Sequence, residues 1–160
     1  MKISIITTGG SIDKLYSYQT SNFEVGEPQV RKILQEANVN FAYTIKPLFK
    51  KDCLHITDQD RKKIRHYIQR TPGKYFMIIH GTDTMVKTAK MLRDIPNKVI
   101  VLTGAMRPAV FKDSDAAFNI GTAMGGLQTL SAGVYLAMNG EIFHHDRARK
   151  NMKLFRFERI

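Results

Sequence analysis

The 160-residue sequence has little cysteine and no long apolar run. Its one cysteine, Cys53, can form no disulfide within the chain and provides too few thiolates for a cysteine-based zinc site. No apolar stretch approaches the ~20 residues that a membrane-spanning helix needs. Residues 1–6 are apolar but too few for a secretory signal, and they lead directly into a turn. These absences predict a cytoplasmic protein without a membrane segment.

Acidic residues are also scarce, with 14 Asp and Glu against 25 Lys and Arg, so the net charge is +11. Such a balance occurs in proteins that bind nucleic acids. Here the basic residues are spread along the chain, including positions 61–70 and 147–159, and no nucleic-acid motif accompanies them. We therefore interpret the excess as solvated surface charge and do not expect nucleic acid to be a partner. The positive charge also leaves open the possibility of an acidic substrate or an acidic partner.

Hydrophobic residues make up 43% of the chain and charged residues 24%, which is typical of a folded domain. Apolar runs predict strands at residues 3–7, 40–49, 75–79, 99–102 and 133–138, and helical spacing predicts helices at residues 30–37, 57–68, 85–92 and 116–130. This alternation predicts a single α/β domain over residues 1–160. We expect a three-layer α/β/α fold of flavodoxin or Rossmann type, with a mostly parallel sheet of about five or more strands. The residues after Met138 have weak periodicity and support no firm assignment.

Small and hydroxyl-bearing residues follow three of the expected strands. The segments are Thr7-Thr8-Gly9-Gly10-Ser11, His80-Gly81-Thr82-Asp83-Thr84-Met85 and Thr103-Gly104-Ala105-Met106-Arg107-Pro108. In parallel sheets ligands bind beyond the carboxyl ends of the strands, so these turns are the candidate site. None has the spacing of a dinucleotide fingerprint or a P-loop.

Taken together, the three segments resemble the signature blocks of bacterial L-asparaginases in sequence, order and spacing. The likeness continues through Asp113, Asp115, Phe118 and Asn119 to the strand at residues 133–138. It covers nearly the whole chain, which is similar to the N-terminal catalytic domain of that family.

The resemblance implies an amidohydrolase that releases ammonia from the side-chain amide of asparagine or a related small amide through an acyl-enzyme. It implies a nucleophile at Ser11 and a second constellation of Thr82, Asp83 and Lys150. The implied substrate-binding residues are Gly10, Cys53, Gly81 and Ala105. No metal or organic cofactor is expected. A hydroxyl needs a nearby base or cation to act as a nucleophile, and a lysine beside an aspartate supplies one.

The sequence also departs from the family pattern. Phe23 stands where the family has a lid tyrosine, and a phenyl ring cannot relay a proton. Tyr16 or Tyr18 could substitute for it. The chain ends at Ile160, about where the first domain would end, so the family's smaller C-terminal domain is expected to be absent. Either an acid such as Glu24 or Glu27 then replaces the carboxylate that a neighbouring subunit supplies in the family, or the true substrate differs.

These departures leave two functional hypotheses open. One is an active amidohydrolase, and the other is a weak or inactive amino-acid-binding or regulatory module that keeps the pocket. In both we expect a homo-oligomer, either a dimer or a tetramer.

Three further residues or pairs have simpler interpretations. We interpret Cys53 as a small buried filler and His80 as a brace for its turn. His144 and His145 could bind a metal, but neighbours in a strand point to opposite faces. A solvated turn is therefore the favoured interpretation of this pair.

Overall fold

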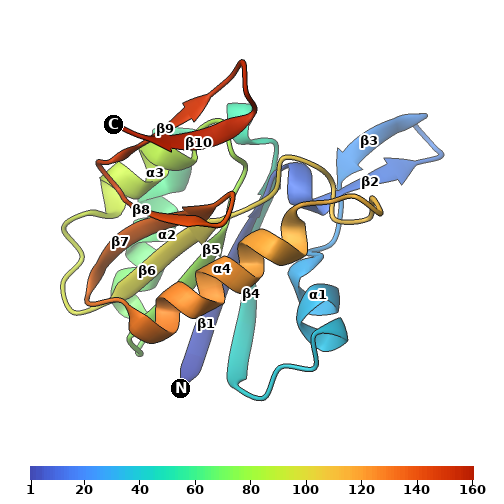
Figure 1. The fold of residues 1–160 in the computed structure, drawn as a ribbon. Coiled ribbons are helices and arrows are strands. Elements are labelled where there is room, and N and C mark those ends of the chain that lie inside the picture. Colours follow the sequence, from blue (N-terminus) through green and yellow to red (C-terminus); the bar gives the residue numbers. More distant parts are fainter.

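The computed structural model describes residues 1–160 as a six-stranded sheet between two layers of helices (Figure 1). The strand order is β4-β1-β5-β6-β7-β8, with β8 antiparallel to β7 and all other pairs parallel. These strands are β1 (Lys2–Gly9), β4 (Ala42–Lys51), β5 (Tyr75–Ile79), β6 (Val99–Thr103), β7 (Gly133–Met138) and β8 (Glu141–His144). The expected three-layer, mostly parallel fold is confirmed.

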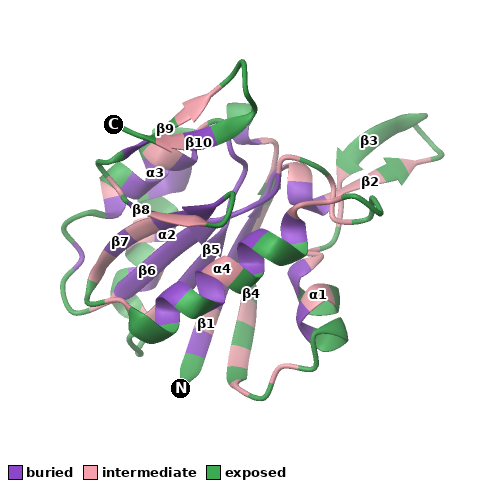
Figure 2. Ribbon diagram, viewed as in Figure 1, coloured by how far each residue is buried: buried purple, intermediate pink, exposed green.

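The two helical layers follow from the alternation of side chains along buried strands. On β1, Ile6 belongs to the core beneath α2 (Asp58–Arg70) and α3 (Met85–Leu92), whereas Ile5 belongs to the core beneath α1 (Val30–Glu36) and α4 (Ala116–Thr129). On β5, Ile78 and Ile79 divide in the same way. Because both faces of the strands are covered, β5 and β6 are almost wholly buried and are apolar up to Thr103 at the end of β6 (Figure 2).

The order of the strands determines where a ligand can bind. The chain passes from β1 through α1 to β4 on one side, and then through α2 to β5 on the other side of β1. The winding therefore reverses between β1 and β5, and the carboxyl ends of strands at such a switch point commonly hold ligands.

Two small hairpins extend beyond this sheet, and the sequence pattern does not predict them. One consists of β2 (Lys14–Ser17) and β3 (Asn22–Val25), and the other of β9 (Ala148–Asn151) and β10 (Arg156–Arg159). They project from opposite sides of the molecule at the same end of the sheet (Figure 1). The strand expected at residues 40–49 is displaced by two residues, to Ala42–Lys51.

None of the helices combines the length and the apolar character needed to cross a membrane.

The glycines of α4 allow a first prediction. A β-carbon at Gly121 would meet nothing within 4 Å, whereas one at Gly126 would lie 2.8 Å from Ile142 Cδ1. Alanine restricts the unfolded chain more than glycine and favours the helix, so Gly121→Ala should raise the free energy of unfolding by about 0.5–1 kcal/mol. Urea unfolding measures this change. Gly126→Ala is the matched comparison and should gain less, and an equal gain in both would contradict this explanation.

Candidate active site

Three glycine-containing turns meet at the carboxyl ends of β1, β5 and β6. Gly10 has φ 95° and ψ −175°, a conformation essentially restricted to glycine, and a β-carbon there would lie 2.6 Å from Gly81 Cα. A β-carbon at Gly104 would lie 2.2 Å from the His80 carbonyl oxygen. Only residues without a side chain allow the three turns to approach so closely. The structure thus brings the three sequence motifs together.

Polar side chains fix the ends of these strands. The Thr8 hydroxyl donates to the Ile79 carbonyl of β5 at 3.0 Å, and the Thr103 hydroxyl donates to the Ala137 carbonyl of β7 at 2.9 Å. In the third turn, Asn119 Nδ2 donates to the Gly104 carbonyl at 3.0 Å, next to the buried Ala105. Each bond joins residues distant in sequence, so the site rests on rigid elements.

Lys150 joins Thr82 and Asp83 in one cluster. Its Nζ donates to Thr82 Oγ1 at 2.7 Å and lies 2.5 Å from Asp83 Oδ1. Thr82 is 4% exposed and the lysine side chain 11% exposed, so water screens the contact between them little, whereas the Asp83 side chain is 31% exposed. Burial alone would raise the pKa of Asp83, but hydrogen bonds from Lys150 and Cys53 hold it below its ordinary value. Asp83 is therefore a carboxylate that anchors the lysine against Thr82.

Cys53 contacts the same carboxylate from the other side. It lies in a short 3-10 helix, Cys53–His55, and its thiol donates to Asp83 Oδ2 at 3.3 Å. Burial raises the pKa of the thiol to about 11, so it is not the thiolate that a cysteine nucleophile needs. A β-carbon at Gly81 would lie 2.3 Å from Cys53 Cβ, which places Cys53 directly against the turn.

A buried chain of hydrogen bonds from Arg61 through Thr88 to His80, here called the relay, supports the turn after β5. His80 Nδ1 lies 2.8 Å from the Gly81 carbonyl oxygen, which can only accept, so Nδ1 carries the proton. His80 Nε2 then accepts from the Thr88 hydroxyl at 2.8 Å, and Thr88 Oγ1 accepts from Arg61 Nε at 3.1 Å. Burial, together with the Arg61 cation, lowers the pKa of His80 to about 4 despite its bond to Gly81. The ring is therefore neutral near pH 7.

The relay fixes the direction of the Gly81–Thr82 peptide. In a trans peptide the N–H points away from the C=O. Because the Gly81 carbonyl faces His80, the Thr82 amide faces away from the relay, and no protein group accepts a hydrogen bond from it. An amide held in this way, in the turn that precedes α3, is suited to bind an anion or a developing oxyanion.

Arg61 corrects an interpretation made from the sequence. It belongs to the basic group at positions 61–70 that the charge pattern assigns to the solvated surface, but it is 2% exposed. Besides Thr88, it donates to the Ile56 carbonyl and to Asp58 Oδ1 at 3.0 and 2.9 Å. These three partners accept hydrogen bonds from its Nε and Nη1. Because Thr88 lies 27 residues away in the chain, local periodicity cannot reveal the contact.

The β2–β3 hairpin follows Ser11 in the chain and carries several aromatic residues. Phe23 is 39% exposed and packs edge-to-face against Tyr16 and Phe111, with ring centroids 5.6 and 5.5 Å apart. Tyr18 is 91% exposed. Tyr16 and Tyr18 also pack edge-to-face against each other, with ring centroids 5.2 Å apart.

Asp13 anchors the base of that hairpin, two residues after Ser11. It is 1% exposed, accepts from the Gln29 amide at 2.9 Å, and its carbonyl accepts from the Gly26 amide at 2.8 Å. Burial raises the pKa of Asp13 to about 6, although the Gln29 amide and Lys50 oppose the shift. The ionised carboxylate is therefore costly in the folded protein at neutral pH.

The raised pKa of Asp13 predicts that replacing this residue by asparagine stabilises the folded protein in a pH-dependent way. The folded protein binds the Asp13 proton more tightly than the unfolded chain does. Protonation of Asp13 therefore stabilises the folded protein fully below pH ~4, and this stabilisation is lost as the pH rises through about 6. Asp13→Asn should thus increase the free energy of unfolding at pH 8 by up to about 3 kcal/mol, and not at pH 4. Urea unfolding at both pH values tests this, with the exposed Asp94→Asn as control. A gain independent of pH would contradict the assignment.

Comparison with known proteins agrees with these features. Residues 2–155 match the family model described as Asparaginase, N-terminal. The chain is 31% identical to L-asparaginase 2 of Escherichia coli over 159 residues, covering 88% of this chain and 43% of that protein. It is 33% identical over 158 residues to a glutamyl-tRNA(Gln) amidotransferase subunit of Pyrococcus abyssi, covering 88% of this chain and 34% of that protein.

Among solved structures, the chain is again similar to an L-asparaginase. The thermostable L-asparaginase from Thermococcus kodakarensis superposes with a TM-score of 0.83 at 26% identity, covering 100% of this chain and 51% of that chain. The chain therefore spans about half the length of this structure and less than half of the curated relatives.

Proposed function

The chain belongs to the asparaginase family by its N-terminal domain, and on that premise we propose that it is an amidohydrolase. Its proposed substrate is a small amide such as the side chain of asparagine or glutamine. The proposed catalytic residues are Ser11, Thr82, Asp83 and Lys150, and the proposed substrate contacts are Gly10, Cys53, Gly81 and Ala105. No cofactor takes part in the proposed reaction.

The proposed reaction has two steps. A hydroxyl of Ser11 or Thr82 adds to the amide carbon, its proton passes to the leaving nitrogen, and ammonia departs to leave an ester. Water then adds to the ester and releases the carboxylate and the free hydroxyl. Lys150 lies within proton-transfer distance of Thr82 Oγ1, and the Thr82 amide can stabilise the oxyanion of both tetrahedral intermediates.

The observation that carries this proposal is the contact of Lys150, which is 11% exposed, with both Thr82 and Asp83. Ammonia release from asparagine, glutamine and simpler amides tests it directly. Purified protein should release ammonia from at least one amide, and Ser11→Ala and Thr82→Val should abolish that release. Absence of release from the whole panel would refute the proposal.

Phe23, at the position of the family's lid tyrosine, favours a second candidate function. A chain without a phenol there could bind an amino acid without consuming it and act as a regulatory module. Aspartate or asparagine would then raise the melting temperature while no ammonia appears. Ammonia release that depends on Thr82 would exclude this alternative.

Assembly and location are further parts of the proposal. We infer a dimer or tetramer of a domain equivalent to the family's N-terminal half, located in the cytoplasm, where a single free cysteine is stable. Light scattering measures the oligomeric state, and a monomer at working concentration would refute it.

A further inference from the structure

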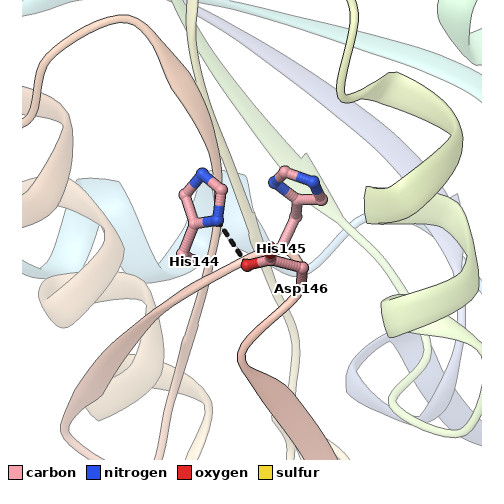
Figure 3. A group of neighbouring side chains, drawn as sticks. All are labelled: His144, His145 and Asp146. Atoms are coloured by element: carbon pink, nitrogen blue, oxygen red, sulfur yellow. Dashed lines mark hydrogen bonds and ion pairs between the residues drawn. The ribbon is translucent and has the colours of Figure 1, made fainter.

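Three adjacent side chains, His144, His145 and Asp146, converge where β8 ends and the chain turns toward β9 (Figure 3). Each offers one ligand atom, and these atoms all lie within 4.8 Å of one another. His144 Nδ1 lies 2.6 Å from Asp146 Oδ1, and the two imidazole centroids are 4.2 Å apart. The cluster lies at the end of β8, the edge strand of the sheet, and shares no residue with the candidate active site.

The strand rule that separates adjacent side chains does not apply here. β8 ends at His144, and His145 already belongs to the turn. The His145 amide donates to the Val134 carbonyl, and the Arg147 amide donates to the His144 carbonyl, at 3.0 and 2.9 Å. These bonds hold the backbone so that both rings lie on the same side, as Figure 3 shows. The expected turn is present, but its histidines do not diverge.

His145 has an unmet bonding requirement. Its Nδ1 is buried, and it is the one buried side-chain nitrogen or oxygen in the structure without a hydrogen-bond partner. A buried polar atom without a partner is costly, and native proteins supply one from protein, water or an ion. The orphan nitrogen belongs to the same group of side chains as a second imidazole and a carboxylate.

We propose that this turn binds one divalent transition-metal cation of the zinc class. Two imidazoles and one carboxylate form a donor set typical of zinc, whereas magnesium and calcium prefer oxygen ligands alone. Ligands around a tetrahedral zinc ion are roughly 3.4 Å apart, so the present spacing requires only small side-chain adjustments. Solvent fills the remaining position, because His144 and Asp146 are about half exposed.

Nearby charges set the strength of the site. Asp146 is the one acid in the cluster, and Arg147 Nε lies 3.9 Å from its Oδ1. Arg93 also acts on His145 through its positive charge. The Arg147 side chain is 69% exposed and can turn toward water when a cation replaces it. These positive charges make the site weaker than an enclosed structural zinc site.

The site has a structural consequence for β9. That strand begins two residues after Asp146 and carries Lys150. A cation bound by the turn would fix the conformation of the segment that leads to Lys150. It would also stabilise the folded chain by mass action.

Isothermal titration of the purified 160-residue protein with zinc chloride tests the proposal. We expect one zinc ion per chain, no saturable heat with magnesium, and a rise in melting temperature with zinc. His144→Asn, His145→Asn and Asp146→Asn should each weaken zinc binding by about tenfold or more. His66→Asn removes an exposed histidine from α2 and is the matched control, with unchanged binding expected.

Two outcomes would overturn the site. One is the absence of saturable zinc binding to the wild-type protein, and the other is zinc binding that all three substitutions leave unchanged. His144 is exposed, so His144→Asn should fold normally even if His145→Asn does not. None of these readouts depends on amide hydrolysis, so failure of this site and failure of the proposed function can be distinguished.

Discussion

Replacing Lys150 by methionine is expected to lower kcat for amide hydrolysis by about 10²- to 10⁴-fold, the range attributed to a positioned acid–base group. The lysine Nζ contacts both Thr82 Oγ1 and Asp83 Oδ1, and its side chain is 11% exposed. Methionine keeps most of the volume but removes the proposed proton carrier and its charge. Thr82 would lose the only side chain that hydrogen-bonds to its hydroxyl.

Two further variants make this prediction specific. Lys150→Arg keeps a charge but cannot be deprotonated, so it separates charge stabilisation from proton transfer. Lys153→Met removes an exposed lysine from the same hairpin and should leave kcat unchanged. Steady-state kinetics with a melting-temperature check on each variant completes the test. A Lys150→Met enzyme with nearly normal kcat would exclude the proposed role.

The layered sheet can be predicted because its sequence signals are local. The apolar run at residues 75–79, for example, is a strand buried on both faces, and α3 has regular apolar spacing. The residues after Met138 carry no such signal. β8, β9 and β10 are four residues each, and their buried positions, such as Phe143 and Phe157, depend on packing against the preformed core.

In the candidate site too, some features can be predicted from the sequence and others cannot. The glycine- and threonine-containing turns are visible in the sequence because parallel topology gathers strand ends. Lys150 follows from family resemblance alone, since no local pattern connects it to Thr82, 68 residues away. The Arg61–Thr88–His80 relay cannot be predicted in this way, because a charged helical residue resembles a solvated one until its partners are known. The features hidden from the sequence are contacts between distant segments.

Gly10→Ala is expected to lower the free energy of unfolding by about 3 kcal/mol or more and to abolish activity. Two independent costs add at this position. The φ of 95° and ψ of −175° belong to a region that only glycine occupies freely. The new β-carbon would also lie 2.6 Å from Gly81 Cα and 2.7 Å from Gly81 N, and these are backbone atoms that cannot rotate away.

Gly73→Ala separates the two costs. Gly73 also has a positive φ, 112°, but an added β-carbon there would meet nothing within 4 Å. It should therefore show the backbone cost alone, about 1–3 kcal/mol in urea unfolding, with full activity. If Gly10→Ala costs no more than Gly73→Ala and stays active, then close contact between the first two turns is not required. If it costs more and loses kcat, close contact between the first two turns is required for activity, since a displacement of about 1 Å can cost 10²-fold in rate.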